Sequence, residues 1–120
     1  MYKRQLYTTL KAFKHQQIVH YVPERNEEGF GISTKGIQHL IDHAVTVVCI
    51  LDCGTSDPDG VEKLRQEGID VIIIDHHLPG ATVPSAFAIL NPVLEETVPE
   101  PYPCAAGVTC LLYTSPSPRD

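Results

Sequence analysis

Several features that would assign this chain to a membrane or secreted class are missing from it. No apolar run approaches the roughly 18 residues that a membrane-spanning helix needs, and the N-terminus has no secretion signal. The four cysteines contain no C-x-x-C pair, and Cys49 lies inside an aliphatic run, which favours reduced thiols over a disulfide framework or a zinc cluster. We therefore expect a cytoplasmic protein that makes no membrane contact.

Positive charge is also scarce. The chain has 9 Lys and Arg against 15 Asp and Glu, a formal net charge of −6. Non-specific binding to nucleic acid depends on clustered Lys and Arg, so this chain alone is not expected to form a broad cationic surface. A phosphate-bearing substrate would need metal ions or another domain to offset its charge.

The middle of the chain reads as a strand, a helix and a second strand. Val45–Asp52 is almost continuously aliphatic, the pattern of a strand buried on both faces of a parallel sheet, and Asp70–Asp75 repeats it. Between them, Asp57 and Pro58 can open a helix that Gly68 closes. A unit of about thirty residues has the length of a right-handed crossover, so the two strands are predicted to be parallel.

Further elements are predicted on both sides of this unit, and no internal repeat is present. They are helical spacing over Leu6–Lys14, a strand over Gln17–Val22, a helix capped by Ser33, a strand over Ser85–Leu90 and a helix from Ala105. With 120 residues the chain fits a single domain. The alternation predicts the α/β class, as a layered, three-layer domain with a mainly parallel sheet.

Chemistry-bearing side chains follow the two central strands. Asp52 and Asp75 stand at their carboxyl ends, and His76 and His77 come directly after Asp75. Ligands of open parallel sheets bind beyond these ends, and carboxylate with imidazole suits manganese, magnesium, iron or zinc. A single strand-end aspartate is more often a cap, and a single histidine more often a packing group. Their adjacency favours a metal site that activates water for phosphoester hydrolysis.

Three other residues are weaker candidates, each with a structural alternative. Arg25 is a candidate for phosphate binding, although a loop arginine paired with a neighbouring glutamate is an equal alternative. Thr55 and Ser56 could meet a phosphate at a helix N-terminus, although helix capping explains them as well. The dipeptide beginning at Asn91 is interpreted as a structural turn.

The motifs YVPERNEEGFG, ILDCGTSD, VIIIDHHLPG, AILNP and YPCAAGVT occur in this order. Together they resemble the RecJ-like branch of the DHH phosphoesterase superfamily, over roughly Leu6–Leu112. The resemblance implies a DHH-domain-like fold and an exonuclease that uses two divalent ions, Mn²⁺ or Mg²⁺, to degrade single-stranded DNA from its 5′ end in DNA repair and recombination.

The resemblance also implies a role for each residue of the site. Asp52 is expected to be a catalytic metal ligand that can bridge both ions, and His76 a second ligand. His77 is expected to be catalytic, near the metals or the scissile phosphate. Asp75 is expected to orient a histidine from behind the ligands.

Parts of the family pattern do not occur in this sequence. An earlier D-x-D metal motif, a later metal-binding aspartate and the C-terminal domains are all missing. The ends, residues 1–5 and 113–120, resemble translated sequencing adapter, which leaves residues 6–112 as a partial, incomplete DHH domain. The isolated chain is therefore expected to bind metal weakly and to hydrolyse little.

Two alternative functions stay open. One is a phosphodiesterase of the same superfamily that acts on short oligonucleotides or cyclic dinucleotides with the same two-metal chemistry. The other is a catalytically inactive α/β module. The sequence carries no signal for an oligomeric state.

Overall fold

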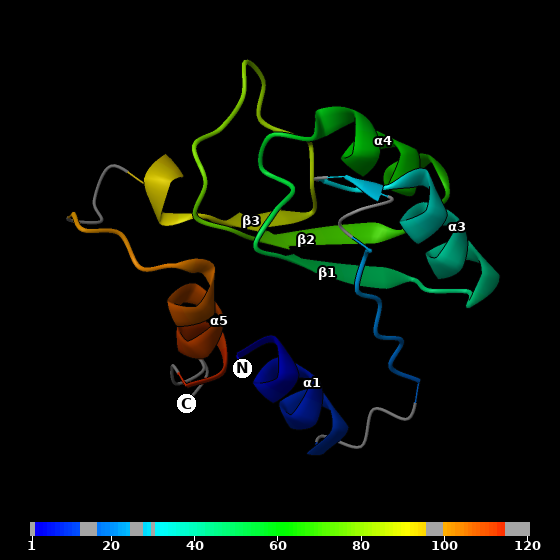
Figure 1. Ribbon diagram of the computed structural model, residues 1–120, viewed down its shortest axis with the longest axis horizontal. Helices are drawn as coiled ribbons and strands as arrows, with labels where there is room; N and C mark the ends of the chain where they lie inside the picture. Colours follow the sequence, from blue (N-terminus) through cyan, green and yellow to red (C-terminus); the bar gives the residue numbers. More distant parts are fainter. Residues whose placement is uncertain (1, 13–16, 25–27, 30, 96–99, 115–120) are drawn as a thin grey trace.

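A small parallel sheet forms the centre of the computed structural model, which describes residues 2–12, 17–24, 28–29, 31–95 and 100–114 (Figure 1). The strands lie in the order β1-β2-β3, and both pairings are parallel. Their bounds are β1 Val47–Leu51, β2 Asp70–Ile74 and β3 Ala88–Leu90. The predicted α/β class with a parallel sheet is confirmed.

Helix α4 (Pro58–Gln66) makes the crossover between β1 and β2. The side chain of Asp57 caps it by accepting a hydrogen bond from the N–H of Gly60 at 3.0 Å. Gly68 follows the helix with φ +75°, a left-handed conformation that costs glycine nothing. Both ends of this helix are therefore where the sequence predicted them.

Helix α3 (Thr34–Asp42) lies with α4 on one face of the sheet (Figure 1). Ser33 caps it by accepting from the N–H of Gly36 at 2.9 Å. Apolar side chains from both helices and from β1 and β2 form the core between the two layers. Its buried members are Ile37, Ile50, Val61, Leu64, Ile69, Val71 and Ile73.

The other side of the sheet is covered in part by α5 (Ala105–Thr114), which contacts β2. Successive side chains of a strand point to opposite faces, so Ile74 lies on the face opposite Ile73, and it is also completely buried. Helix α1 (Tyr2–Ala12) packs against α5 (Figure 1). The arrangement has three layers: α3 with α4, the sheet, and α5 with α1.

The prediction that the first aliphatic strand is buried on both faces is wrong. Val47 is 51% exposed and Cys49 is also exposed. In the described part of the chain β1 is an edge strand, and the third layer meets the sheet at β2 rather than at β1. Among the described elements, one face of β1 is therefore left largely exposed.

The strand predicted over Gln17–Val22 is also wrong. Residues 17–24 have no regular secondary structure, and they enter no ladder with any described strand. The aliphatic pattern alone cannot supply a partner strand, and Val22 is 68% exposed. Elsewhere the differences are in the bounds: α1 begins before Leu6, and β3 begins three residues after Ser85. Among the described helices, none has both the length and the apolar character needed to cross a bilayer.

Candidate metal centre

The carboxyl ends of β1 and β2 bring three metal-capable side chains together. Asp52 directly follows β1, and His76 and His77 follow β2 one residue after it ends. One ligand atom from each of the three lies within 4.8 Å of the others. His76 Nε2 lies 3.4 Å from Asp52 Oδ1. Three of the residues singled out from the sequence thus converge at one edge of the sheet.

Asp52 has a left-handed backbone, with φ +68°. Its N–H donates to the carbonyl oxygen of Ile74 at 2.9 Å, which fixes it against the end of β2. Aspartate tolerates this conformation better than most residues with a side chain. Two residues later, Gly54 has φ +105°, and a Cβ there would lie 3.2 Å from Ile50. The D-C-G sequence therefore makes a sharp turn at the end of β1.

Asp75 lies behind the two histidines and is 1% exposed. Its Oδ1 accepts the Nδ1–H of His77 at 2.6 Å and the N–H of His76 at 2.8 Å. Burial raises the pKa of Asp75, but hydrogen bonds from the Thr55 hydroxyl, His77 and two main-chain N–H groups outweigh it and lower the pKa to about 2. Asp75 is therefore ionised at neutral pH.

The hydrogen bond to Asp75 also determines how His77 can act. When Nδ1 carries the proton that Asp75 accepts, the lone pair of a neutral imidazole is at Nε2. The side chains of Asp52, His76 and His77 are 37%, 34% and 57% exposed, so solvent reaches all three. One carboxylate oxygen and two imidazole nitrogens form a donor set that suits a divalent transition ion such as Mn²⁺.

Thr55 and Ser56 both lie beside this site. Thr55 is completely buried, and its N–H donates to Asp75 Oδ2 at 3.2 Å. The hydroxyl of Ser56 donates to the carbonyl oxygen of Leu78 at 2.9 Å. In this structure both residues connect the loop after β1 to the loop after β2, a placement that does not favour a phosphate contact by Thr55. Arg25, the third phosphate candidate, lies outside the described residues.

Asn91 is a residue of the site that sequence reasoning interpreted only as a turn. Its Oδ1 does cap the short 3₁₀ helix η1 (Pro92–Leu94) by accepting from the N–H of Val93 at 3.0 Å. Its Nδ2, however, donates to Thr55 and to the main-chain oxygen of His77. The missed signal is its position as the first residue after a third parallel strand. Ligands of open parallel sheets bind beyond the carboxyl ends of the strands, and this rule applies to Asn91 as it does to Asp52.

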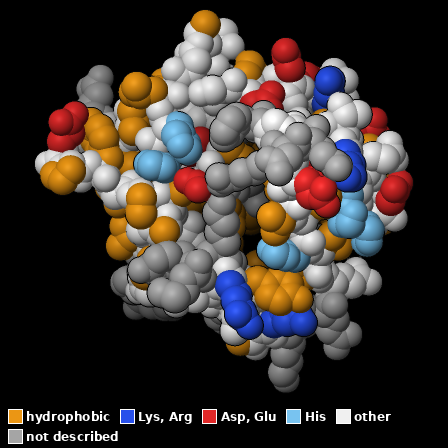
Figure 2. Space-filling model, viewed as in Figure 1, with side chains coloured by type: hydrophobic (Ala, Val, Ile, Leu, Met, Phe, Trp, Pro, Cys, Tyr) orange, Lys and Arg blue, Asp and Glu red, His pale blue; other side chains and the backbone are white. Residues whose placement is uncertain are grey.

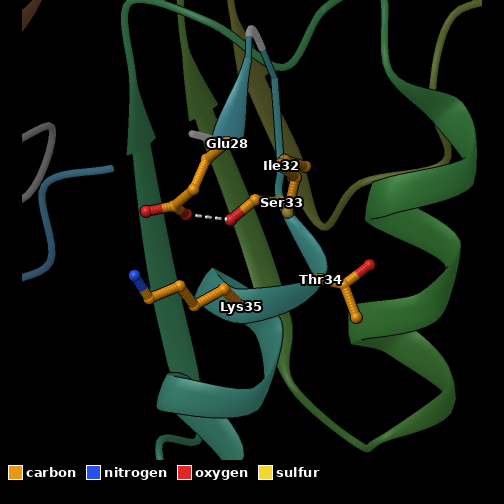
Figure 3. A pocket seen from close by; sticks show the side chains of 5 residues that line it. All are labelled: Glu28, Ile32, Ser33, Thr34 and Lys35. Carbon is orange, nitrogen blue, oxygen red and sulfur yellow. Dashed lines mark hydrogen bonds between the residues drawn. The ribbon is translucent and has the colours of Figure 1, made fainter. Parts of the chain in front are cut away.

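A separate cavity of about 450 Å³ lies at the N-terminus of α3, lined by Glu28, Ile32, Ser33, Thr34 and Lys35 (Figure 3). The carboxylate of Glu28 accepts hydrogen bonds from the hydroxyls of Ser33 and Tyr21. These bonds, with the N–H of Glu24, lower the pKa of Glu28 to about 2. The metal-capable residues at the strand ends are not among its lining residues, so this cavity is distinct from the metal centre.

The surface in Figure 2 carries acidic and basic side chains side by side. In that view, Lys and Arg side chains form a small group at the lower edge and otherwise lie among Asp and Glu. Histidine side chains reach this surface in more than one place. Attraction of an anionic polymer to this face would therefore depend on bound cations or on surface supplied from elsewhere.

Comparison with known proteins assigns the chain to a family. Residues 4–118 match the family described as "DHH family, N-terminal domain". The single-stranded-DNA-specific exonuclease RecJ of Escherichia coli (strain K12) is 40% identical over 87 residues, which cover 72% of this chain and 15% of that protein. Its counterpart in Dickeya dadantii (strain 3937) is 33% identical over 104 residues, covering 87% of this chain and 18% of that protein.

Two solved structures are also similar. A crystal structure of exonuclease RecJ bound to manganese has a TM-score of 0.75 and 29% identity, covering 89% of this chain and 27% of that chain. A structure of RecJ from Thermus thermophilus in complex with Mn²⁺ has a TM-score of 0.54 and 31% identity, covering 63% of this chain and 12% of that chain. The chain spans less than a fifth of the curated relatives named above. Because the family match covers nearly all of the chain, the chain belongs to the DHH family and corresponds to its N-terminal domain.

Proposed function

We propose that this chain is part of the catalytic domain of a metal-dependent exonuclease that degrades single-stranded DNA from its 5′ end. The observation that carries the proposal is the convergence of Asp52, His76 and His77 within 4.8 Å at the carboxyl end of a parallel sheet. The relatives that share this segment are named as single-stranded-DNA-specific exonucleases. Their substrate and this donor set agree, because phosphodiester hydrolysis commonly uses divalent ions.

The residues at this site would have two different roles, metal binding and orientation of a ligand. Asp52, His76 and His77 would hold a divalent ion, Mn²⁺ or Mg²⁺, and Asp52 would also serve as a ligand of a second ion. Such ions supply Lewis-acid stabilisation of a phosphodiester during its hydrolysis. Asp75 is held ionised and buried, so its part is to accept the Nδ1–H of His77 and orient the ring so that Nε2 faces the ion.

The proposal extends to the protein around this segment. Residues 6–112 would be the native part of the DHH domain, with the remaining metal ligands and most of the DNA-binding surface supplied by the rest of a longer protein. Its acidic balance, with a net charge of −6, fits a segment that does not itself track the DNA backbone. We place the activity in DNA repair and recombination in the cytoplasm.

The test uses the full-length protein that contains this segment. With Mn²⁺ present, it should release nucleotides from a 5′-labelled single strand and leave a matched duplex largely intact. Asp52→Ala and His76→Ala should each lower the rate about 100-fold or more, because losing a ligand removes several kcal/mol of stabilisation at the reacting phosphate.

His43→Ala is the matched control, since His43 is an exposed residue at the end of α3, in the loop that leads into the opposite end of β1. It should leave the rate unchanged. Full activity of both site variants would refute the residue assignment. Rapid cleavage of dinucleotides with slow digestion of long strands would instead identify a phosphodiesterase for short substrates.

A further inference from the structure

Four residues beside the metal centre form a closed ring of hydrogen bonds. Asn91 Nδ2 donates to the hydroxyl oxygen of Thr55 at 3.1 Å and to the main-chain oxygen of His77 at 2.9 Å. Thr55 in turn bonds to Asp75, since its N–H donates to Oδ2 at 3.2 Å and its hydroxyl lies beside the same carboxylate, and Asp75 accepts the Nδ1–H of His77 at 2.6 Å. The ring therefore joins the segments that follow β1, β2 and β3.

Three members of this ring are inside the protein. Thr55, Asp75 and Asn91 are 0%, 1% and 3% exposed, whereas the side chain of His77 is 57% exposed. Buried polar groups are costly unless they are bonded, and every buried side-chain nitrogen and oxygen of the described residues has a partner. The buried part of the ring is thus a fully satisfied network that ends on one solvent-facing histidine.

The chemistry of Asn91 fits this position closely. A primary amide offers two N–H donors and one oxygen acceptor, and all three are used: the donors by Thr55 and His77, the oxygen by the N–H of Val93. Aspartate has the same size but no donor, and an aliphatic side chain has neither group. Capping of η1 needs only the oxygen, so the two donor bonds require a separate explanation.

We propose that Asn91 and Thr55 are positioning residues for His77. Asn91 fixes the main chain of His77, Thr55 fixes Asp75, and Asp75 fixes the imidazole, which together hold His77 within reach of Asp52 and His76. The inference rests on the proposed function in one respect, which is that it takes His77 as a metal ligand. Hydrogen bonds that orient a ligand typically change metal affinity by about 10- to 100-fold.

The sharpest test is a pair of substitutions at Thr55. Thr55→Val keeps the shape of the side chain and removes the hydroxyl. This breaks the bond from Asn91 and the contact of the hydroxyl with Asp75, while the main-chain N–H of Thr55 still donates to Asp75. Thr55→Ser keeps the hydroxyl and should behave as the wild-type chain does. Mn²⁺ affinity, measured by water-proton relaxation, should fall about 10-fold in Thr55→Val and stay unchanged in Thr55→Ser.

Asn91→Ser is the second variant, and it carries the comparison if Thr55→Val fails to fold. Serine retains an oxygen that can cap η1 but offers no amide donors. The control for lost stability alone is Ile37→Val, which removes a methylene from the main core outside the ring. It should lower the unfolding midpoint and leave Mn²⁺ affinity unchanged, whereas an equal loss of affinity in this control would overturn the proposal.

A metal-free measurement separates this proposal from the proposed function. Main-chain ¹⁵N relaxation of residues 76–78 should show greater mobility in Thr55→Val and Asn91→Ser than in the wild-type chain or Ile37→Val. If the full-length protein that contains this segment binds no Mn²⁺, the metal assignment fails, and this mobility still decides whether Asn91 and Thr55 position His77. Unchanged mobility in both ring variants would overturn the inference.

Discussion

The Nδ1 atom of His77 lies 2.6 Å from Oδ1 of Asp75, and the two residues differ sharply in exposure. The Asp75 side chain is 1% exposed and the His77 side chain 57%. The carboxylate is thus shielded from water, while the imidazole ring that it orients projects into the solvent. Placing the charge behind the ligand fixes the tautomer of the imidazole without blocking its second nitrogen.

Replacing Asp75 with asparagine should weaken both folding and metal binding. In the wild-type chain the two carboxylate oxygens of Asp75 accept from several N–H groups, but an asparagine side chain has only one oxygen. Its NH₂ group would face the N–H of Thr55, so that two donors would meet. We expect unfolding free energy in urea to fall by about 2 kcal/mol, because buried donors lose a charged acceptor. Mn²⁺ affinity should fall by about 10-fold or more.

Asp70→Asn makes the same chemical change at the opposite end of the same strand, where the residue is exposed. It should change stability by less than about 0.5 kcal/mol, as surface substitutions usually do, with no effect on Mn²⁺ affinity. If Asp75→Asn bound Mn²⁺ as tightly as Asp70→Asn, Asp75 would have no role in orienting the site.

The left-handed backbone of Asp52 leads to a second prediction, in which glycine and alanine at that position differ. Both substitutions remove the carboxylate and should abolish its contribution to Mn²⁺ binding equally. Glycine adopts φ +68° without a Cβ penalty, so Asp52→Gly should be more stable than Asp52→Ala by about 1 kcal/mol in urea unfolding. The opposite order would mean that residue 52 is not held in this conformation.

Ala44 provides the control for this backbone effect. It also has a positive φ, +50°, but lies just after α3, in the loop that leads to the start of β1. Ala44→Gly should raise stability by about 1 kcal/mol for the same reason and leave Mn²⁺ affinity unchanged. The two glycine variants together separate relief of backbone strain from loss of a ligand.

How much of this could be predicted from the sequence depends on whether the information is local. The crossover was predictable because Asp57, Pro58 and Gly68 specify the ends of α4 within the chain itself. The convergence of Asp52 with His76 and His77 was predictable because the carboxyl ends of adjacent parallel strands meet at one edge. In both cases a short pattern and a general rule are enough.

Features that depend on distant partners were not predictable. The aliphatic run over Gln17–Val22 has a strand pattern, but no described strand pairs with it. The exposed face of β1 depends on where α5 packs, which the pattern of β1 does not contain. Asn91 looked like a turn because its capping of η1 is local, whereas its bonds to Thr55 and His77 span 36 and 14 residues.

The carboxylate of Glu28 gives the final prediction, which concerns stability against pH. It accepts hydrogen bonds from the hydroxyl of Ser33 (Figure 3), the hydroxyl of Tyr21 and the N–H of Glu24, and these lower its pKa from 4.5 to about 2. A carboxyl group whose pKa is lower in the folded state stabilises the fold above its unfolded pKa and loses that contribution as pH falls through the folded value. The Glu28 contribution should therefore be complete above about pH 5 and decline toward pH 2. In Glu28→Gln this pH-dependent part is missing, so the difference in urea midpoint between the wild-type chain and the variant should shrink as pH falls through that window.

Glu62→Gln, an exposed change on α4, provides the comparison for the loss of one carboxylate from the surface. A difference between wild type and Glu28→Gln that stayed constant from pH 6 to about pH 2.5 would show that these hydrogen bonds do not hold Glu28 ionised in solution.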